Sequence, residues 1–201
     1  MTLEACVESF SEAKIAMKNG ANRIELCENL SVGGTTPSYG TIKKSRELPV
    51  PCFVMIRPRG GNFSYSEDEI EIMNSDIIMC KELGVLGIVL GVLNNENEID
   101  YPLLKNLIEL AKPMSITFHK AIDEVSNPLM DIPKLIELGV DRILTSGKQN
   151  KAFEGKDLLN QMIKKADNKI KILVCGGVTK ENLIEIQSLI PNNEYHGKKI
   201  V

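Results

Sequence analysis

One kind of junction occurs three times in the sequence and restricts the folds open to this chain. In each case a helical stretch ends at a glycine, and a short strand-like run follows at once. The three junctions are 18–24 (KNGANRI), 82–88 (ELGVLGI) and 137–143 (ELGVDRI). Glycine closes a helix well because it adopts the left-handed backbone conformation without the steric cost of a Cβ atom. The repetition predicts one α/β unit used several times within a single domain spanning residues 1–201.

Short runs rich in valine and isoleucine alternate with longer stretches of helical periodicity. This alternation is typical of βαβ units and of a parallel sheet. We predict eight strands, near residues 3–6, 22–26, 52–56, 86–90, 115–118, 141–145, 170–174 and 194–196. Helices are expected to begin between them, near residues 8, 38, 66, 100, 127, 154 and 179. Eight strands at this length favour an α/β fold of the TIM-barrel type, a (β/α)8 barrel; a doubly wound open sheet is the structural alternative.

The last predicted strand is followed by few residues. Five residues, 197–201, come after the strand at 194–196, which is too few for a helix of ordinary length. We therefore expect the barrel to lack a full eighth helix. Its outer face near the last and first strands is then expected to be covered by a second copy, in a homodimer, or by the amino-terminal elements.

Composition restricts the partners and the compartment. The net charge is only -3 and charges of both signs are interspersed, so no basic footprint for nucleic acid or for an anionic membrane is present. Glu4 and Glu8 stand where a signal peptide needs a basic and then an apolar run. Five cysteines without paired spacing fit reduced thiols. These features predict a cytoplasmic protein whose partner is a metal ion or a small anionic molecule.

Charged residues and glycines gather at or just beyond the predicted carboxyl ends of the strands, where TIM barrels carry their functional groups. Two arginines beside a glycine pair suit a loop that closes over phosphate or carboxylate, although a solvated loop is the alternative. Backbone N–H groups after strands 6 and 7 suit a phosphate, unless the glycines there only form turns. The predicted substrate-binding residues are Arg57, Arg59, Lys120, Ser146, Gly176, Gly177 and His196.

Three residues are candidates for acid–base chemistry. His119 suits a general base, Asp123 four residues later suits the carboxylate that orients it, and Glu25 suits the acid. A strand-end histidine held by a neutral hydrogen bond is the structural alternative, and metal ligation by both histidines with Glu25 is another. For Arg23 and Arg142, which share one position in the repeat, we favour ion pairs inside the barrel.

Two cysteines fall near the ends of the first two predicted strands. Adjacent strands lie about 4.8 Å apart, so Cys6 and Cys27 can approach closely enough to share one soft metal ion. Thiolates are soft ligands, which makes copper(I) the natural candidate. The alternative is that both cysteines pack as small buried apolar residues. Cys175 is a possible accessory ligand, whereas Cys52 and Cys80 are expected to be structural.

Seven segments resemble, in the same order, motifs of the CutC copper-homeostasis family. They are 6–9 (CVES), 23–27 (RIELC), 33–40 (GGTTPSYG), 55–61 (MIRPRGG), 117–121 (TFHKA), 141–147 (DRILTSG) and 176–178 (GGV). The resemblance spans nearly the whole chain and implies a cytoplasmic TIM barrel associated with copper tolerance. It departs from the family at Lys120, Ile122 and Cys175, where arginine, phenylalanine and glycine are usual. Lysine lacks the planar fork of arginine, which weakens the case for bidentate anion binding there.

Two functions from different classes therefore stand side by side. The first, implied mainly by the resemblance, is copper homeostasis through copper(I) bound at Cys6 and Cys27. The second is a TIM-barrel enzyme of unassigned reaction that acts on a small phosphorylated or carboxylated metabolite. In that enzyme Arg57 holds the anion and His119 is the acid or base. A barrel that serves only as an interaction module is a third interpretation, because this scaffold supports many functions.

Overall fold

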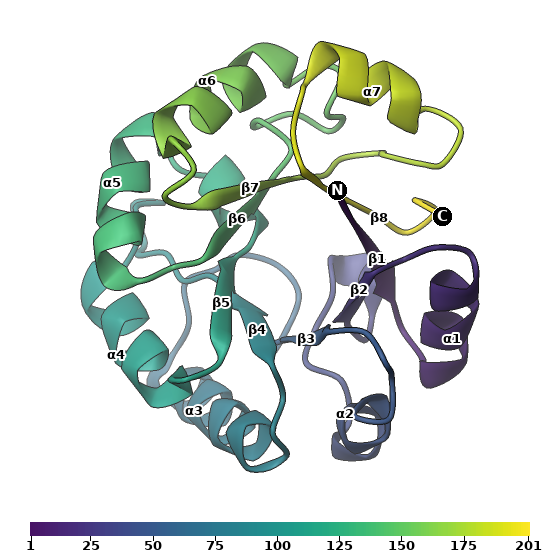
Figure 1. Cartoon of the computed structure of the whole chain (residues 1–201). Coiled ribbons are helices and arrows are strands. Elements are labelled where there is room, and N and C mark those ends of the chain that lie inside the picture. Colours follow the sequence, from purple (N-terminus) through teal and green to yellow (C-terminus); the bar gives the residue numbers. More distant parts are fainter.

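A closed barrel of eight parallel strands forms the centre of the molecule (Figure 1). The computed structural model describes residues 1–201, and each strand pairs with its neighbours in chain order until β8 returns to β1. This confirms the predicted TIM barrel and excludes the open sheet. The strands are β1 (Thr2–Val7), β2 (Arg23–Leu26), β3 (Cys52–Met55), β4 (Gly87–Leu90), β5 (Ser115–Phe118), β6 (Arg142–Thr145), β7 (Lys171–Val174) and β8 (Glu194–Gly197).

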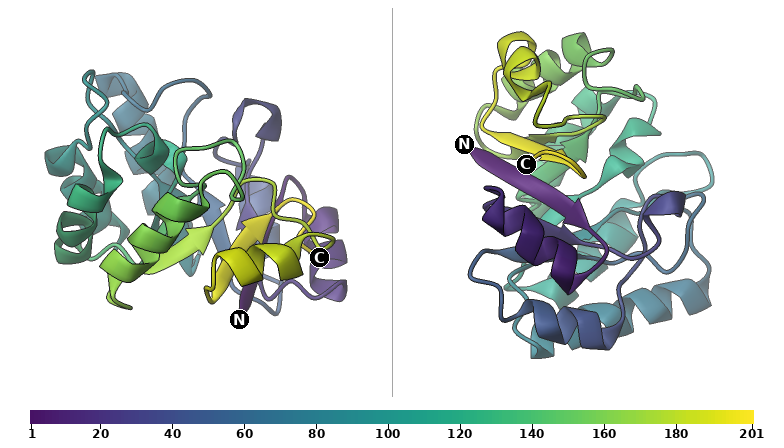
Figure 2. Two further views of the ribbon diagram at one scale, coloured as in Figure 1. Left: turned by 90° about the horizontal axis from the view of Figure 1, so that it is seen from above. Right: turned by 90° about the vertical axis from the view of Figure 1, so that its right-hand side faces the viewer.

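Seven α-helices surround the barrel (Figures 1 and 2). They are α1 (Phe10–Lys18), α2 (Tyr39–Ser45), α3 (Glu67–Glu82), α4 (Tyr101–Ala111), α5 (Pro128–Leu138), α6 (Lys156–Ala166) and α7 (Leu183–Leu189), with the short 3-10 helices η1 (Leu30–Val32) and η2 (Lys120–Asp123). Ser38, Ser66 and Asp100 cap helices by accepting a backbone N–H three residues on, which explains why helices begin there. No helix has an apolar stretch long enough to cross a bilayer.

The glycines of the three repeated junctions all adopt the conformation that the sequence predicts. Gly20, Gly84 and Gly139 have φ angles of 116°, 71° and 86°, in the region that favours glycine. Each one turns the chain from a helix directly into a strand of the barrel. The three junctions are therefore the same αβ turn.

The ring of helices is incomplete between α7 and α1. Residues 198–201 contain no helix, and the C-terminal residues run there, beside α1 (Figure 1). The predicted absence of a full eighth helix is thus confirmed for this chain. Ile15 on α1 and Ile184 on α7 are 60% and 81% exposed. The homodimer stays a prediction, which the mass of the protein in light scattering will test.

Side chains alternate between two different environments along the strands. The outward side chains join the helices in one apolar core of 46 buried residues. Those pointing into the barrel form a mixed interior, with two small apolar clusters and several buried charges. In register, Glu4 of β1 pairs with Arg23 of β2 and with His196 of β8, and Cys6 pairs with Glu25. The same alternation therefore places thiols, carboxylates and a histidine in successive layers inside the barrel.

Candidate functional site

A cavity of about 330 Å³ lies at the carboxyl-terminal mouth of the barrel. Its lining comes from residues at or beyond the ends of β1, β2, β3, β5, β6, β7 and β8. The residues used below are Cys6, Glu25, Met55, Arg57, Phe63, His119, Lys120, Cys175, Gly176, Gly177, His196 and Lys198. This is the end of a TIM barrel where functional groups gather.

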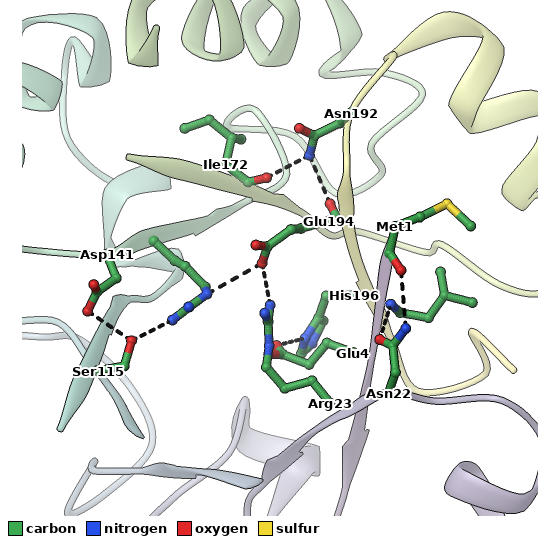
Figure 3. A network of polar contacts seen from close by, with 12 residues as sticks. Met1, Glu4, Asn22, Arg23, Ser115, Asp141, Ile172, Asn192, Glu194 and His196 are labelled. Atoms are coloured by element: carbon green, nitrogen blue, oxygen red, sulfur yellow. Dashed lines mark hydrogen bonds and ion pairs between the residues drawn. The ribbon is translucent and has the colours of Figure 1, made fainter. Parts of the chain in front are cut away.

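An ionic network fills the barrel interior beneath this cavity (Figure 3). Arg23 lies between two carboxylates, pairing with Glu4 and, at 2.5 Å from Nη2 to Oε2, with Glu194. Arg142 approaches the same Glu194 carboxylate at 3.4 Å and donates a hydrogen bond to Ser115. The two arginines thus form the interior ion pairs that their repeat position predicts. Such buried charges are tolerated because each has a partner of opposite sign.

His196 connects this network to the cavity. Its Nδ1 lies 2.8 Å from Oε1 of Glu4, and its Nε2 lies 3.7 Å from Oε2 of Glu25. Burial alone lowers the pKa of this imidazole, but the charge of Glu25 and the hydrogen bonds with Cys6 and Glu4 together raise it well above its ordinary value. Burial likewise opposes ionisation of Glu4, yet His196 and Arg23 lower its pKa to about 2. His196 is therefore an imidazolium held between two carboxylates.

The structure brings Cys6 and Cys27 together, as the strand positions predict. Their Sγ atoms are 3.8 Å apart, and Sγ of Cys27 lies 3.4 Å from Oε2 of Glu25. The ligand atoms of Cys6, Glu25 and His196 all lie within 4.8 Å of one another. The hydrogen bond with Cys27, burial and the charge of Glu25 raise the pKa of Cys6 well above its ordinary value. The hydrogen bond with Cys6 lowers the pKa of Cys27, but burial and the charge of Glu25 outweigh it and raise that pKa to about 12.

The remaining cysteines occupy different places. Cys52 and Cys80 are buried in the core between strands and helices, away from the cavity. Cys175 follows β7 and lines the cavity as part of a small cluster with Leu144 and Leu173. Burial raises the pKa of its thiol despite the nearby charge of Lys120. Only Cys6 and Cys27 therefore form a close pair of sulfur atoms.

His119 lies at the end of β5 in a setting unlike that of His196. Its Nδ1 accepts the backbone N–H of Ala121 at 3.2 Å, and its ring packs on Phe63 with centroids 4.8 Å apart. Burial and the charge of Arg57 lower its pKa to about 3. With Nδ1 accepting, the proton of the neutral ring is on Nε2, which is buried and has no hydrogen-bond partner. His119 is therefore a neutral imidazole with an N–H to donate. This matches the alternative of a strand-end histidine held by a neutral hydrogen bond, and not a general base.

The predicted His119–Asp123 pair does not form. The Asp123 carboxylate accepts hydrogen bonds from Thr145, from the backbone of Ser146 and Lys148, and from Lys120 at 2.7 Å. Asp123 thus links η2 to the loop after β6, because the turn of η2 directs the Asp123 side chain toward that loop. Ser146, also predicted to bind substrate, is fully buried and bonds to Asp123 and Gln149 instead of lining the cavity. Both residues thus hold the loops beside the cavity.

The two predicted anion-binding arginines bind backbone carbonyl groups of the loops after β2 and β3. Arg57 lines the cavity, but its terminal nitrogens donate to the carbonyl oxygens of Val32, Gly34 and Gly61. Arg59 pairs with Glu69 at 2.5 Å and with three nearby carbonyls, and it does not line the cavity. In this structure backbone carbonyls occupy the terminal nitrogens of Arg57, only its Nε has no partner, and anion binding there stays a prediction. These arginines fix the loops after β2 and β3.

Some residues of the site escaped the sequence prediction. Met55 and Phe63 line the cavity, and Glu194 anchors both interior arginines. Met55 precedes Arg57 by two positions and Glu194 precedes His196 by two, so strand alternation provided a signal for both. Phe63 lies in the loop after β3, where the sequence has no periodicity from which the direction of a side chain could be predicted. The predicted Lys120, Gly176, Gly177 and His196 do line the cavity.

Comparison with known proteins gives one consistent result. The model of the CutC family matches residues 1–201. A CutC family protein from Enterococcus faecalis is 44% identical over 209 residues, covering 100% of both chains. The human copper homeostasis protein cutC homolog is 42% identical over 195 residues, covering 96% of this chain and 71% of the human protein. A crystal structure of CutC from Streptococcus agalactiae superposes with a TM-score of 0.95 at 37% identity, covering 100% of both chains.

Proposed function

Because this chain belongs to the CutC family, we propose that it serves copper homeostasis by binding one copper(I) ion between the thiolates of Cys6 and Cys27. The observation that carries the proposal is the distance of 3.8 Å between the sulfur atoms of Cys6, which lines the cavity, and Cys27 behind it. The names of the human and streptococcal relatives point to copper as the metal. Copper(I) is among the metals that soft thiolate ligands select.

The surroundings of the thiols suit a monovalent soft cation. Two thiolates around copper(I) carry one net negative charge, and the imidazolium of His196 lies within 4.8 Å of Cys6 to balance it. Oε2 of Glu25 accepts a hydrogen bond from the Cys27 thiol at 3.4 Å and so holds that side chain in place. In this arrangement His196 and Glu25 support the two ligands and need not bind the metal themselves.

Access to the pair runs through the cavity. Cys6 lines the cavity, whereas Cys27 is fully buried, so the ion meets Cys6 first. Gly34 covers the Cys27 sulfur so closely that an added Cβ would lie 3.3 Å from it. A reducing compartment such as the cytoplasm keeps both thiols available for the metal and prevents their oxidation.

The test is an anaerobic titration of the reduced protein with copper(I) against a competing chelator. We expect one ion per chain in the wild type and its loss in the Cys6→Ser/Cys27→Ser variant. The Cys52→Ser/Cys80→Ser variant is a matched control, because it removes the same number of buried thiols away from the cavity. Binding that survives in the first variant, or that is lost equally in both, would contradict the proposed site.

A further inference from the structure

We propose that the same cavity binds a small anionic hydroxycarbonyl compound. Its carbonyl oxygen accepts a hydrogen bond from Nε2 of His119, and its hydroxyl group donates one to Oε1 of Glu25. The proposal does not rest on copper binding, because it starts from an N–H donor that no metal ion can satisfy. Both residues line the cavity from different strands, β5 and β2.

The donor on one side is fixed in place and unused. His119 is 3% exposed, and its Nε2 has no acceptor in the protein. The bond from Ala121 to Nδ1 and the packing against Phe63 hold the ring in one orientation. Gly91 approaches so closely that any side chain there would overlap the imidazole. A buried donor without a partner costs about 1–3 kcal/mol, so its retention calls for an acceptor supplied from outside.

The acceptor on the other side is equally unused. Glu25 is 2% exposed, and while its Oε2 faces Cys27 and His196, its Oε1 has no partner. A carboxylate oxygen accepts hydrogen bonds and cannot donate them when ionised. The group that meets it must therefore carry a hydrogen, as a hydroxyl group does.

The space between these two residues limits the size of the ligand. The cavity holds about 330 Å³, at the lower end of the range for small-molecule sites. Met55, Leu144 and Cys175 give it apolar wall sections. Because Nε2 of His119 and Oε1 of Glu25 are both buried, the ligand must insert its oxygen atoms into the barrel mouth. These dimensions suit a short carbon chain with adjacent oxygen atoms.

The rim of the cavity favours a negative charge at the other end of this ligand. Gly176 and Gly177 line the cavity, and neither backbone N–H donates to a group of the protein. Lys198 is exposed on the same rim, and Lys120 has donor capacity beyond its bonds to Asp123 and Ser146. Asp123 neutralises much of the charge of Lys120. The N–H groups of Gly176 and Gly177 and the ammonium group of Lys198 are therefore the main donors to the anionic end of the ligand. Phosphate and carboxylate both fit these donors.

The experiment uses copper-free protein kept in chelator and reads the imidazole nitrogens by NMR. The chain has only two histidines, so one variant assigns every signal. The probes are dihydroxyacetone phosphate and hydroxypyruvate, which share the hydroxyketone and differ in the anion. Glycerol 3-phosphate lacks the carbonyl group and is the matched control. We expect the Nε2–H signal of His119 to move downfield with one or both hydroxyketones and to stay in place with the control.

Variants test the two contacts separately. His119→Phe keeps the packing on Phe63 but removes the donor, and we expect at least a tenfold loss of affinity. His119→Asn, which retains an N–H group, guards against misfolding of the first variant. Glu25→Gln should weaken binding several-fold, whereas Lys44→Ala on the exposed face of α2 should leave it unchanged. An Nε2–H signal unmoved by either hydroxyketone at millimolar concentration, or moved equally by glycerol 3-phosphate, would overturn the proposal. The proposal that Cys6 and Cys27 bind copper(I) would still stand after that result.

Discussion

The two histidines of this chain line one cavity and have opposite chemistry. His196 lies between the carboxylates of Glu4 and Glu25, which raise its pKa and keep it charged. His119 packs against Phe63, and burial together with the charge of Arg57 lowers its pKa to about 3. The neighbours, and not the strand-end position, decide which imidazole is a cation and which is a neutral donor. One wall of the cavity is thus suited to thiolates, and the other to a ligand oxygen.

Removing the carboxylate that holds His196 should produce the largest effect. In Glu4→Ala the charges of Arg23 and His196 lose their shared buried partner, and we expect the free energy of unfolding to fall by about 3–5 kcal/mol. Urea unfolding at neutral pH measures this loss. Glu47→Ala, which breaks an exposed pair with Lys44, should cost under about 1 kcal/mol. Similar costs for the two variants would show that the interior network contributes little.

The opposite pKa shifts predict opposite responses to pH. The pKa of His196 is raised, so its contribution to stability is complete below about pH 6.5 and is lost as the pH rises through the higher folded value. The pKa of His119 is lowered to about 3, so its contribution is present above about pH 6.5 and is lost as the pH falls toward 3. A tenfold change in the proton affinity of either imidazole on folding corresponds to about 1.4 kcal/mol of stability.

Histidine variants separate these two responses. Unfolding measured from pH 4 to pH 9 should show a flatter acid side for His119→Phe and a flatter alkaline side for His196→Gln. The carboxylates also titrate on the acid side, because the pKa of Glu4 is lowered to about 2, so each variant is compared with the wild type at the same pH. Identical pH profiles for both variants would remove the contrast between the two histidines.

Strand and helix positions were largely predictable, because each depends on local signals. Apolar runs marked most of the eight strands, whose predicted bounds agree with the structure to within about one residue. The capping residues Ser38, Ser66 and Asp100 marked helix starts. The proximity of Cys6 to Cys27 followed from strand order and the spacing of about 4.8 Å between strands. These features needed no knowledge of loop paths.

Side-chain partners in the loops were not predictable from spacing. Asp123 follows His119 by four residues, yet the 3-10 turn of η2 directs it to Thr145 and Lys148 instead. Arg57 has the composition of an anion clamp, but its guanidinium group binds carbonyls that come from two separate loops. Both outcomes depend on how distant segments meet in space. Residue type alone therefore overestimated the number of free charges in the cavity.

Gly91, just after β4, lies close to His119 and allows a smaller test of how this neutral imidazole is held. Gly91→Ala places a methyl group against the imidazole and Ala121, and we expect a loss of about 1–3 kcal/mol with a displaced Nε2–H signal. Gly40→Ala is the matched control, because nothing lies near its added Cβ in α2 and helix propensity favours alanine by about 0.5–1 kcal/mol. An unchanged His119 signal in Gly91→Ala would mean that the ring is not held as described.

The aromatic contact on His119 should give the smallest effect. Phe63→Leu removes a ring that lies 4.8 Å from the imidazole and under the guanidinium group of Arg57, and we expect a cost of about 1 kcal/mol. The ring-current shift due to Phe63 should disappear from the His119 signals, where the ring of Phe118 remains at 6.2 Å, and leave those of His196 unchanged. Phe153→Leu, which alters an exposed ring that is not part of the cavity lining, is the control. If the His196 signals moved as well, the two walls of the cavity would be coupled, and their separate chemistry would have to be treated as one titrating unit.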